Sequence, residues 1–271
     1  MTTKIGFNFS ENTTEKREFV IPEVIEDEQI IRKSLVEIKF PDVYKPYTYY
    51  NDSFSLKIGD RVFVDGKLEG VMGVVVNITY NFKIKLSDYK RVIGKADANV
   101  QGEFHFAGSH FVAFDPTALP YEKALTWFKA PEADEEYVTV TDGLTFPLET
   151  LDGLQYDQGD LENGGDIYMD NDVQYIELNG TKGRAIVTTS KPYIVEFTYK
   201  NGEIGELYCE CYHVTPCKHC FATLLQLRET LKSIEQNYSE QYTKTKYFST
   251  VLKTTFFNLV VDSKTTGSIN L

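Results

Sequence analysis

Residues 208–220 of the chain read Tyr208-Cys209-Glu210-Cys211-Tyr212-His213-Val214-Thr215-Pro216-Cys217-Lys218-His219-Cys220. All four cysteines of the 271 residues fall within this run. Zinc prefers four thiolate or imidazole ligands in a tetrahedron, and this single loop offers that number. Clustered cysteines in a chain without a signal peptide favour metal ligands over a disulfide framework. The run therefore predicts one metal site.

A predicted β-hairpin leads into the cysteine run. Tyr193–Tyr199 alternates along its length, and Asn201-Gly202 is a strong signal for a tight turn. Glu203–Cys211 is the predicted return strand. Because residues i and i+2 of a strand share a face, the side chains of Cys209 and Cys211 are expected to point the same way.

A predicted helix follows the run. Thr215 suits the N-cap and Pro216 the first helical position, so we expect a helix through Cys217 to about Asn237. Cys217 and His219 then lie in the first turn, where free backbone N–H groups favour thiolate over thiol. The five residues before Cys217 are enough to return the chain toward the first pair of cysteines.

Hairpin, C-x-C, short loop, C-x-H and apolar helix together resemble the SWIM zinc finger family over residues 183–232. The resemblance implies one structural zinc ion and a role in DNA binding or protein interaction. SWIM modules occur beside helicase-like, transposase-like and ubiquitin-ligase-like proteins, and the sequence shows no such companion. The ligands that the resemblance implies are Cys209, Cys211, Cys217 and His219.

Two other side chains compete with His219 for the fourth position. Cys220 follows Cys217 by three residues and lies on the same face of the predicted helix, and His213 lies inside the loop. A further alternative is that no metal binds and the cysteines only pack, as free cysteines often do.

The first part of the chain is predicted to be rich in strands. Arg61–Val64, Gly73–Tyr80 and Phe82–Leu86 have strand character, and Asp65-Gly66 signals a turn. Residues 54–95, with the phrase Lys57-Ile58-Gly59-Asp60-Arg61-Val62, resemble a small SH3-like barrel. Such barrels bind proteins or nucleic acids, or serve only as packing modules.

The remaining segments complete an α+β prediction. The predicted helices are Glu23–Leu35 and Ala118–Phe128, and the predicted strands are Glu18–Ile21, Val36–Phe40, Val100–Phe114, Tyr137–Thr141, Val173–Leu178 and Arg184–Thr188. Ala130-Pro131 suggests a boundary. We therefore expect two domains: residues 1–130, strand-rich with the SH3-like core, and residues 131–271, with the acidic segment and the zinc finger.

The net charge of −12 is concentrated in one segment. Residues 131–177 hold fourteen acidic and no basic residues, so the rest of the chain has 28 basic against 26 acidic residues. Broad phosphate binding needs a basic footprint, and no strong one appears, although a local nucleic-acid site is left open. The stretch Asp157–Asp166 is predicted to be a polar, glycine-rich loop that is solvated or faces a partner.

Several weaker signals favour structural roles. The acidic side chains of the loop do not follow the EF-hand pattern for calcium; they are Asp157, Asp160, Glu162, Asp166, Asp170 and Asp172. His105 and His110 are expected on opposite faces of a strand, which argues against a shared metal. The sequence has no long apolar run and no signal peptide, so we expect an intracellular, cytoplasmic protein without membrane contact.

The leading hypothesis is a non-catalytic protein-interaction module that works in a larger, nucleic-acid-associated assembly. The alternative is a direct DNA- or RNA-binding protein, whose basic residues should form one face; these are Lys182, Arg184, Lys191, Lys218, Arg228 and Lys232. An enzyme is not expected, because four protein ligands close the coordination shell of the metal. The sequence also contains no nucleophile elbow, H-E-x-x-H helix or phosphate-binding loop.

Overall fold

Alternating residues and a two-residue turn build the hairpin that ends at the cysteines. Strands β12 (Pro192–Lys200) and β13 (Glu203–Cys209) are joined by Asn201 and Gly202. The φ angles of these two residues are 53° and 87°, the combination that a type I′ turn requires. The predicted hairpin is confirmed, with its second strand ending at Cys209.

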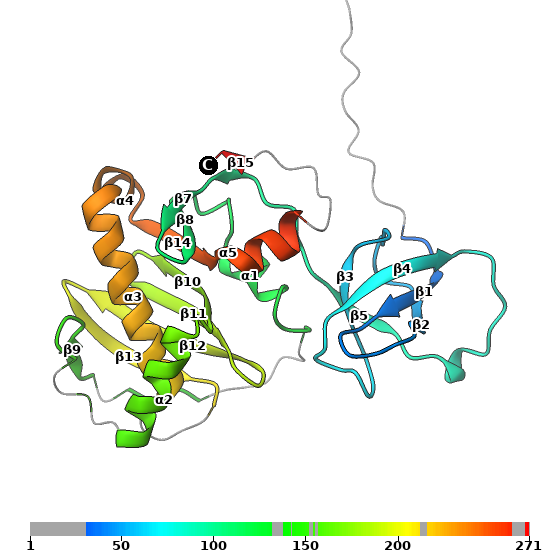
Figure 1. Cartoon of the computed structure of the whole chain (residues 1–271), viewed down its shortest axis with the longest axis horizontal. Helices are drawn as coiled ribbons and strands as arrows, with labels where there is room; N and C mark the ends of the chain where they lie inside the picture. The colour runs from blue at the N-terminus through cyan, green and yellow to red at the C-terminus, as the bar shows by residue number, and fades with distance from the viewer. Residues whose placement is uncertain are drawn as a thin grey trace, which may run out of the picture. The chain divides into compact units, whose positions relative to one another are not determined.

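An eight-stranded antiparallel sheet extends from this hairpin (Figure 1). The computed structural model describes residues 31–131, 138–141, 143–151, 154, 157–211, 216–261 and 269–270. The spatial order of the strands is β7 (His105–Ala107), β8 (His110–Ala113), β14 (Tyr247–Leu252), β10 (Val173–Asn179), β11 (Lys182–Thr188), β12, β13 and β9 (Thr145–Pro147).

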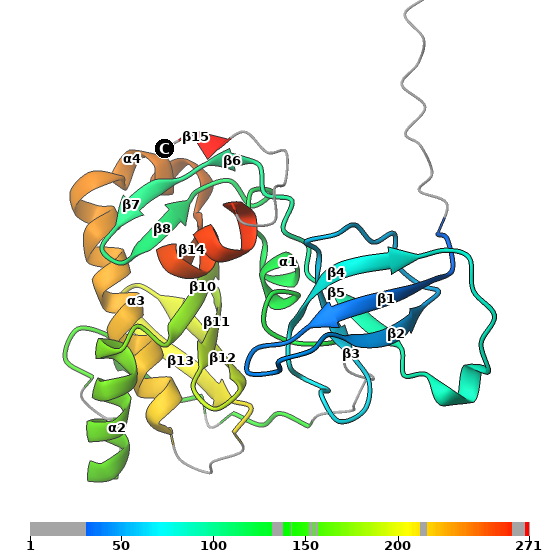
Figure 2. The same cartoon turned by 45° about the vertical axis from the view of Figure 1, so that its right-hand side comes forward.

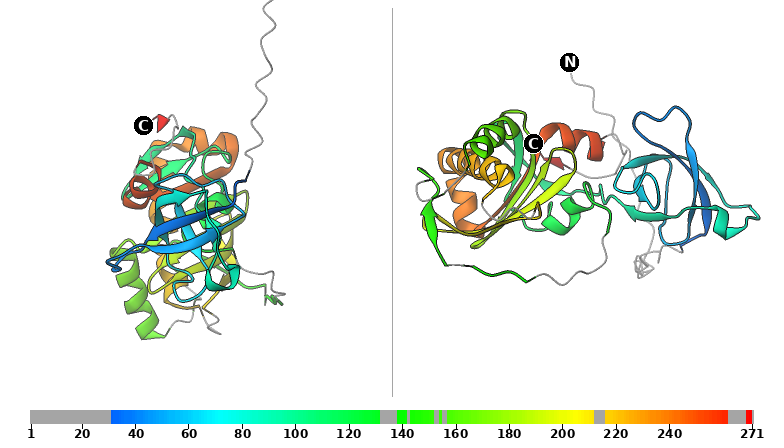
Figure 3. Two further views of the ribbon diagram at one scale, coloured as in Figure 1. Left: turned by 90° about the vertical axis from the view of Figure 1, so that its right-hand side faces the viewer. Right: turned by 90° about the horizontal axis from the view of Figure 1, so that it is seen from below.

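Two helices cover one face of this sheet (Figure 3). The long helix α3 (Lys218–Asn237) contacts the central strands, and α2 (Gln158–Met169) packs against α3. The core between them buries aliphatic side chains from strands and helix alike, among them Ile176, Ala185, Val195, Leu224 and Leu227. The short helix α4 (Ser239–Thr245) follows α3 and leads into β14.

Helix α2 corrects the prediction of a polar loop at Asp157–Asp166. The side chain of Asp157 accepts a hydrogen bond from the backbone N–H of Gly159 at 2.8 Å and caps the helix. Ile167 is buried, and Gly164 lets the helix backbone approach Lys218 and Phe221 at the start of α3. Tertiary packing therefore stabilises a helix whose polar, glycine-rich sequence favours a loop.

The opposite face of the sheet carries a second core. Helix α1 (Tyr121–Leu125), helix α5 (Lys253–Phe256) and the π-helical turn η2 (Phe257–Val261) contribute to it. Tyr175, Ile186 and Ile194 of the sheet pack into this core. The phenol of Tyr175 donates a hydrogen bond to the backbone oxygen of Leu119 at 2.8 Å. A short parallel pair, β6 (Gly102–Glu103) with β15 (Ile269–Asn270), completes this part of the chain.

The other sheet has five antiparallel strands and closes on itself (Figure 2). Its order is β2 (Tyr47–Asn51), β1 (Ser34–Lys39), β4 (Gly73–Thr79), β3 (Arg61–Val64) and β5 (Val92–Lys95). Tyr50 of β2 bridges Arg91, next to β5, and the N–H of Tyr50 donates to the oxygen of Lys90 at 2.9 Å. This contact joins the two end strands, so the five strands form a small barrel around a separate apolar core.

Some predicted elements differ from those observed. Phe82–Leu86 is not a strand, because the closed barrel offers no free edge for it; the 3-10 turn η1 (Leu86–Asp88) lies there instead. The predicted helix Ala118–Phe128 shortens to α1. Residues 138–141 form no strand, and the part of Glu23–Leu35 from residue 31 on leads into β1 rather than a helix. The strand predicted at Glu18–Ile21 lies outside the described residues.

The fold class is α+β, as predicted: two antiparallel sheets with a few helices. All described residues belong to one unit of the chain, Ile31–Leu271. Strands β7 and β8 precede residue 130, yet they pair within the sheet that also holds β10–β14. The domain boundary at residue 130 stays a prediction. No helix in the described part of the chain combines the length and the apolar character that crossing a bilayer requires.

Candidate metal centre

The end of β13 and the start of α3 bring the predicted ligands together. Cys209 is the last residue of β13 and pairs with Val195 on β12. Cys217 is the N-cap of α3, and His219 is the second residue of the helix. Helix α3 thus begins two residues later than predicted. The backbone of Cys217 is extended (φ −95°, ψ 176°) and not helical, so its side chain can point toward the other predicted ligands.

The four ligand atoms form a compact group. The sulfurs of Cys209, Cys211 and Cys217 and a ring nitrogen of His219 all lie within 4.8 Å of one another. Nδ1 of His219 is 3.7 Å from Sγ of Cys209 and 3.6 Å from Sγ of Cys217. A tetrahedral zinc site with bonds of about 2.3 Å to sulfur and about 2.0 Å to nitrogen has neighbouring ligand atoms about 3.5–3.8 Å apart. This group can therefore hold a metal ion, and its spacing is compatible with zinc.

Backbone contacts hold the cysteine pair on the hairpin in place. The N–H of Cys211 donates to the sulfur of Cys209 at 3.5 Å, a contact that stabilises a thiolate. Glu210, between the two cysteines, accepts a hydrogen bond from the N–H of Ile194 at 3.3 Å. Its carboxylate also lies 3.1 Å from Nζ of Lys129. These bonds fix the turn in which both cysteines sit.

Tyr193 fixes the imidazole of His219. The two rings are stacked, with centroids 4.2 Å apart and an angle of 22° between planes. His219 is buried, and its Nε2 has no hydrogen-bond partner among the described residues. Nδ1 is therefore the nitrogen that faces the sulfurs. Sequence reasoning missed Tyr193, because its position depends on strand register. Val195 pairs with Cys209, and Tyr193, two residues earlier on the same face of β12, therefore lies over the start of α3.

Hydrogen bonds among the cysteine side chains shift their pKa values in opposite directions. Hydrogen bonds from the thiols of Cys209 and Cys220 hold the pKa of Cys217 far below its usual value. Hydrogen bonding to Cys217 and Cys220, together with burial, raises the pKa of Cys209 well above it. A divalent cation needs deprotonated thiols as ligands, so its binding to this group would release protons.

The two competing ligands differ in position. Sγ of Cys220 is buried and lies 3.8 Å from Sγ of Cys217. Cys220 is nevertheless not a member of the set whose ligand atoms all lie within 4.8 Å of one another. His213 lies outside the described residues, so its role as a ligand stays a prediction.

The six predicted basic contact residues are divided between the two faces of the eight-stranded sheet. Arg184 points away from α3: it lies over the ring of Tyr121 at 4.0 Å and pairs with Glu122 and Glu177, each at 3.0 Å. Lys182 shares that face, since it is two residues away on the same strand. Arg228 and Lys232 belong to α3, on the other side of the sheet.

The last two of these residues lie close to the metal centre. Lys191 is 5.3 Å from the ring centroid of Tyr193, and Lys218 is the first residue of α3, between Cys217 and His219. Arg184 is neutralised by two carboxylates, whereas neither Lys191 nor Lys218 forms an ion pair with another described residue.

The other histidines and the acidic run form no second metal centre within the described residues. His110 is fully buried; its Nε2 lies 2.7 Å from the oxygen of Val173, and its Nδ1 lies 3.0 Å from Oγ of Ser109. The ring of His105 packs against Tyr238, with centroids 5.0 Å apart. The acidic side chains that do not follow the calcium-binding pattern lie on or beside α2.

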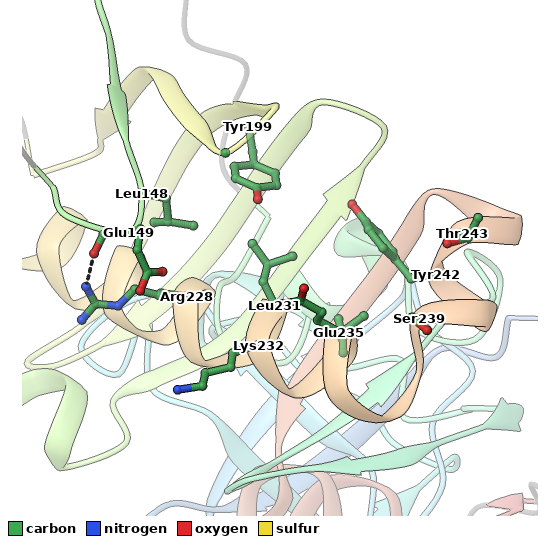
Figure 4. Close-up of a pocket in the computed structure, with 12 residues that line it drawn as sticks. Leu148, Glu149, Tyr199, Arg228, Leu231, Lys232, Glu235, Ser239, Tyr242 and Thr243 are labelled. Atoms are coloured by element: carbon green, nitrogen blue, oxygen red, sulfur yellow. Dashed lines mark hydrogen bonds between the residues drawn. The ribbon is translucent and has the colours of Figure 1, made fainter.

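A groove of ≈ 550 Å³ runs along α3 and α4 (Figure 4). Leu148, Tyr199, Leu231 and Tyr242 supply apolar surface. Charged side chains of both signs line it, namely Arg228, Lys232, Glu149 and Glu235. Arg228 donates a hydrogen bond of 2.8 Å to the backbone oxygen of Glu149, which fixes one side of the groove.

No protein-family model, no curated protein and no solved structure matches this chain. The assignment of the site therefore rests on its own geometry and on the resemblance carried by the cysteine run.

Proposed function

We propose that this chain holds one structural zinc ion through Cys209, Cys211, Cys217 and His219 and acts as a non-catalytic protein-interaction module. The observation that carries the proposal is the spacing of the ligand atoms, which matches the edges of a zinc tetrahedron. Three thiolates and one imidazole form a typical structural set, in contrast to the open site of a zinc enzyme.

The role of the metal is to join two elements. It would connect the end of a hairpin to the first turn of a helix, next to the apolar core that the two elements share. Metal binding can supply folding free energy to such a region. The order hairpin, ligands, helix also supports the resemblance to SWIM zinc fingers, and the five-stranded barrel supports the resemblance to SH3-like barrels.

Two observations favour a protein partner over nucleic acid at the finger. The basic residues expected on one face lie on both faces of the sheet, and Arg184 is neutralised by Glu122 and Glu177. The groove along α3, by contrast, combines apolar surface with charges of both signs, as protein interfaces do. We propose that it receives a protein segment whose acidic side chain meets Lys232.

The zinc assignment is tested by metal analysis of the full chain. Purified protein is expected to carry one zinc per chain, and Cys209→Ser is expected to lose the metal and unfold the hairpin–helix region, while the barrel survives. Amide hydrogen exchange would separate these two regions. Normal zinc content and unchanged exchange in the variant would overturn the ligand assignment.

The interaction surface is tested separately from the metal. Binding of short nucleic acids is compared for the wild type and for Lys218→Ala/Arg228→Ala/Lys232→Ala. The protein-interaction proposal expects equal binding by both. A large, salt-dependent loss in the triple variant would instead establish the finger as a nucleic-acid platform.

A further inference from the structure

The loop between β4 and β5 interleaves basic and aromatic residues. Residues 80–91 read Tyr80-Asn81-Phe82-Lys83-Ile84-Lys85-Leu86-Ser87-Asp88-Tyr89-Lys90-Arg91. They contain four basic residues, one acidic residue and three aromatic rings. The loop leaves one strand of the barrel and returns to another that is not its neighbour, and Figure 2 shows it projecting beyond the strands.

Strand register shows where this loop runs. Thr79 of β4 pairs with Leu35 of β1, Leu35 pairs with Tyr50 of β2, and Tyr50 bridges Arg91. Thr79, Leu35, Tyr50 and Arg91 therefore lie side by side in one row across the barrel. The loop connects the first residue of this row to the last. The loop crosses the ends of β1 and β2, and the ring of Phe82 meets that of Tyr50 with centroids 6.3 Å apart.

The side chains of the loop are accessible. Tyr80 is 42% exposed, and the guanidinium of Arg32 lies 4.1 Å from its ring centroid. Lys83, Lys85 and Lys90 are exposed, whereas Phe82 and Tyr89 are half-buried. Lys83 and Lys90 form no ion pair with any described residue, and Lys85 lies 4.0 Å from the exposed carboxylate of Asp88. Arg91 is already paired with Asp52 at 2.8 Å.

The barrel differs in charge from the rest of the chain. Residues 31–95 contain twelve basic and seven acidic residues, a net charge of +5, whereas the whole chain has a net charge of −12. An anionic partner would therefore meet a favourable potential at the barrel and an unfavourable one along the acidic segment.

We propose that the loop patch, defined as Arg32, Tyr80, Phe82, Lys83, Lys85, Tyr89 and Lys90, binds single-stranded nucleic acid. Lysines place positive charge against phosphates, and aromatic rings offer stacking surfaces to bases, the combination that single-strand binding proteins use. A duplex hides its bases from such rings. An anionic membrane needs positive charge but no ring positioned for base stacking, so the ring of Tyr80, held in place by Arg32, favours a single strand.

Fluorescence anisotropy on the full, zinc-loaded chain tests the proposal. The probes are labelled oligothymidylate and oligouridylate of about 12 nucleotides, within the range of site sizes for small barrels. Lys83→Ala/Lys85→Ala is expected to make the negative slope of log K against log salt shallower by about 1.4, because each phosphate contact on a single strand contributes about −0.7. Tyr80→Ala is expected to weaken binding about tenfold without changing that slope.

Two controls make the result specific. Lys200→Ala/Lys244→Ala removes the same charge from exposed positions outside the barrel and should leave affinity unchanged. Thermal melting of each variant checks that the barrel stays folded. Absence of oligonucleotide binding at low salt would overturn the proposal. Binding of a duplex as tight as that of a single strand, with no effect of Tyr80→Ala, would also overturn it. So would binding of phosphatidylserine vesicles but not of oligonucleotides.

Discussion

At the residue scale, the proposed metal centre depends on which side chain occupies the fourth position. His219 places Nδ1 within 3.7 Å of two sulfurs, and Tyr193 stacks on its ring. Cys220 lies next to Cys217, buried but outside the compact set. Its thiol is well placed to donate a hydrogen bond to the thiolate of Cys217. Cys220 would then support a ligand without binding the metal itself.

Substitutions at these two positions should have different effects. Cys220→Ala is expected to keep one metal per chain, whereas His219→Ala should weaken metal binding by at least tenfold, because it removes a ligand and leaves a cavity. The cobalt(II)-substituted proteins provide the measurement, since their charge-transfer absorption reports the number of thiolate ligands. Loss of a thiolate signal in Cys220→Ala would show that Cys220, not His219, binds the metal.

His110 should make the fold sensitive to acid. Burial lowers the pKa of its imidazole in the folded state, although the hydrogen bond to Val173 opposes this shift. Because protonation is easier in the unfolded chain, stability is present above the unfolded pKa of about 6.5 and is lost as the pH falls toward the folded pKa.

The prediction for His110 is measured by urea unfolding between neutral and mildly acidic pH. His110→Gln should be less stable than the wild type at neutral pH, and the difference should shrink on acidification by at most about 1.4 kcal/mol per pH unit. The metal centre is the same in both proteins, so its own pH dependence cancels. A difference that stays constant with pH would contradict the prediction.

At the element scale, the contact between α2 and α3 supports the candidate metal centre. A Cβ at Gly164 would lie 2.7 Å from the backbone oxygen of Lys218 and 2.9 Å from a ring carbon of Phe221. Lys218 lies between two of the ligands. The close approach of the two helices therefore holds the first turn of α3, and a shift of α2 would disturb the ligands directly.

Two adjacent glycines give a matched test of this contact. Gly164→Ala should destabilise the protein by about 1–3 kcal/mol and weaken metal binding, because the methyl group forces the helices apart. Gly165→Ala meets nothing within 4 Å, so it should be neutral or stabilise the helix by up to about 1 kcal/mol. Thermal melting and a metal-competition titration measure both effects. Equal behaviour of the two variants would mean that α2 does not press on α3.

At the scale of the whole molecule, the two sheets are stabilised in different ways. The barrel closes through backbone pairing of Tyr50 with Arg91, around its own apolar core. The eight-stranded sheet is covered on both faces, and we propose that a metal ion clamps its hairpin to α3. The acidic segment keeps the net charge of the chain strongly negative while the barrel remains positive.

Removal of the metal should therefore act on one part of the molecule. A strong chelator is expected to lower the melting temperature, since saturation at a thousand times Kd contributes about 4 kcal/mol. Hydrogen exchange should rise in β12, β13 and the first turns of α3 and remain unchanged in β1–β5. Uniform exchange throughout the described residues after chelation would argue against a local clamp.

By itself, the sequence determined the features that depend on neighbouring residues. The cysteine spacing marked the candidate ligand group, Asn201-Gly202 marked the hairpin turn, runs of β-branched residues marked β3 and β4, and alternation marked β12, because these signals act over a few bonds. Tertiary structure decided the rest. Packing at Gly164 stabilises α2 as a helix, and closure of the barrel leaves Phe82–Leu86 without a partner strand. Strand register stacks Tyr193 on His219, and the packing of α3 on the sheet places Arg184 and Arg228 on opposite sides of it. Each of these depends on contacts between residues far apart in the chain, and such contacts leave no local pattern.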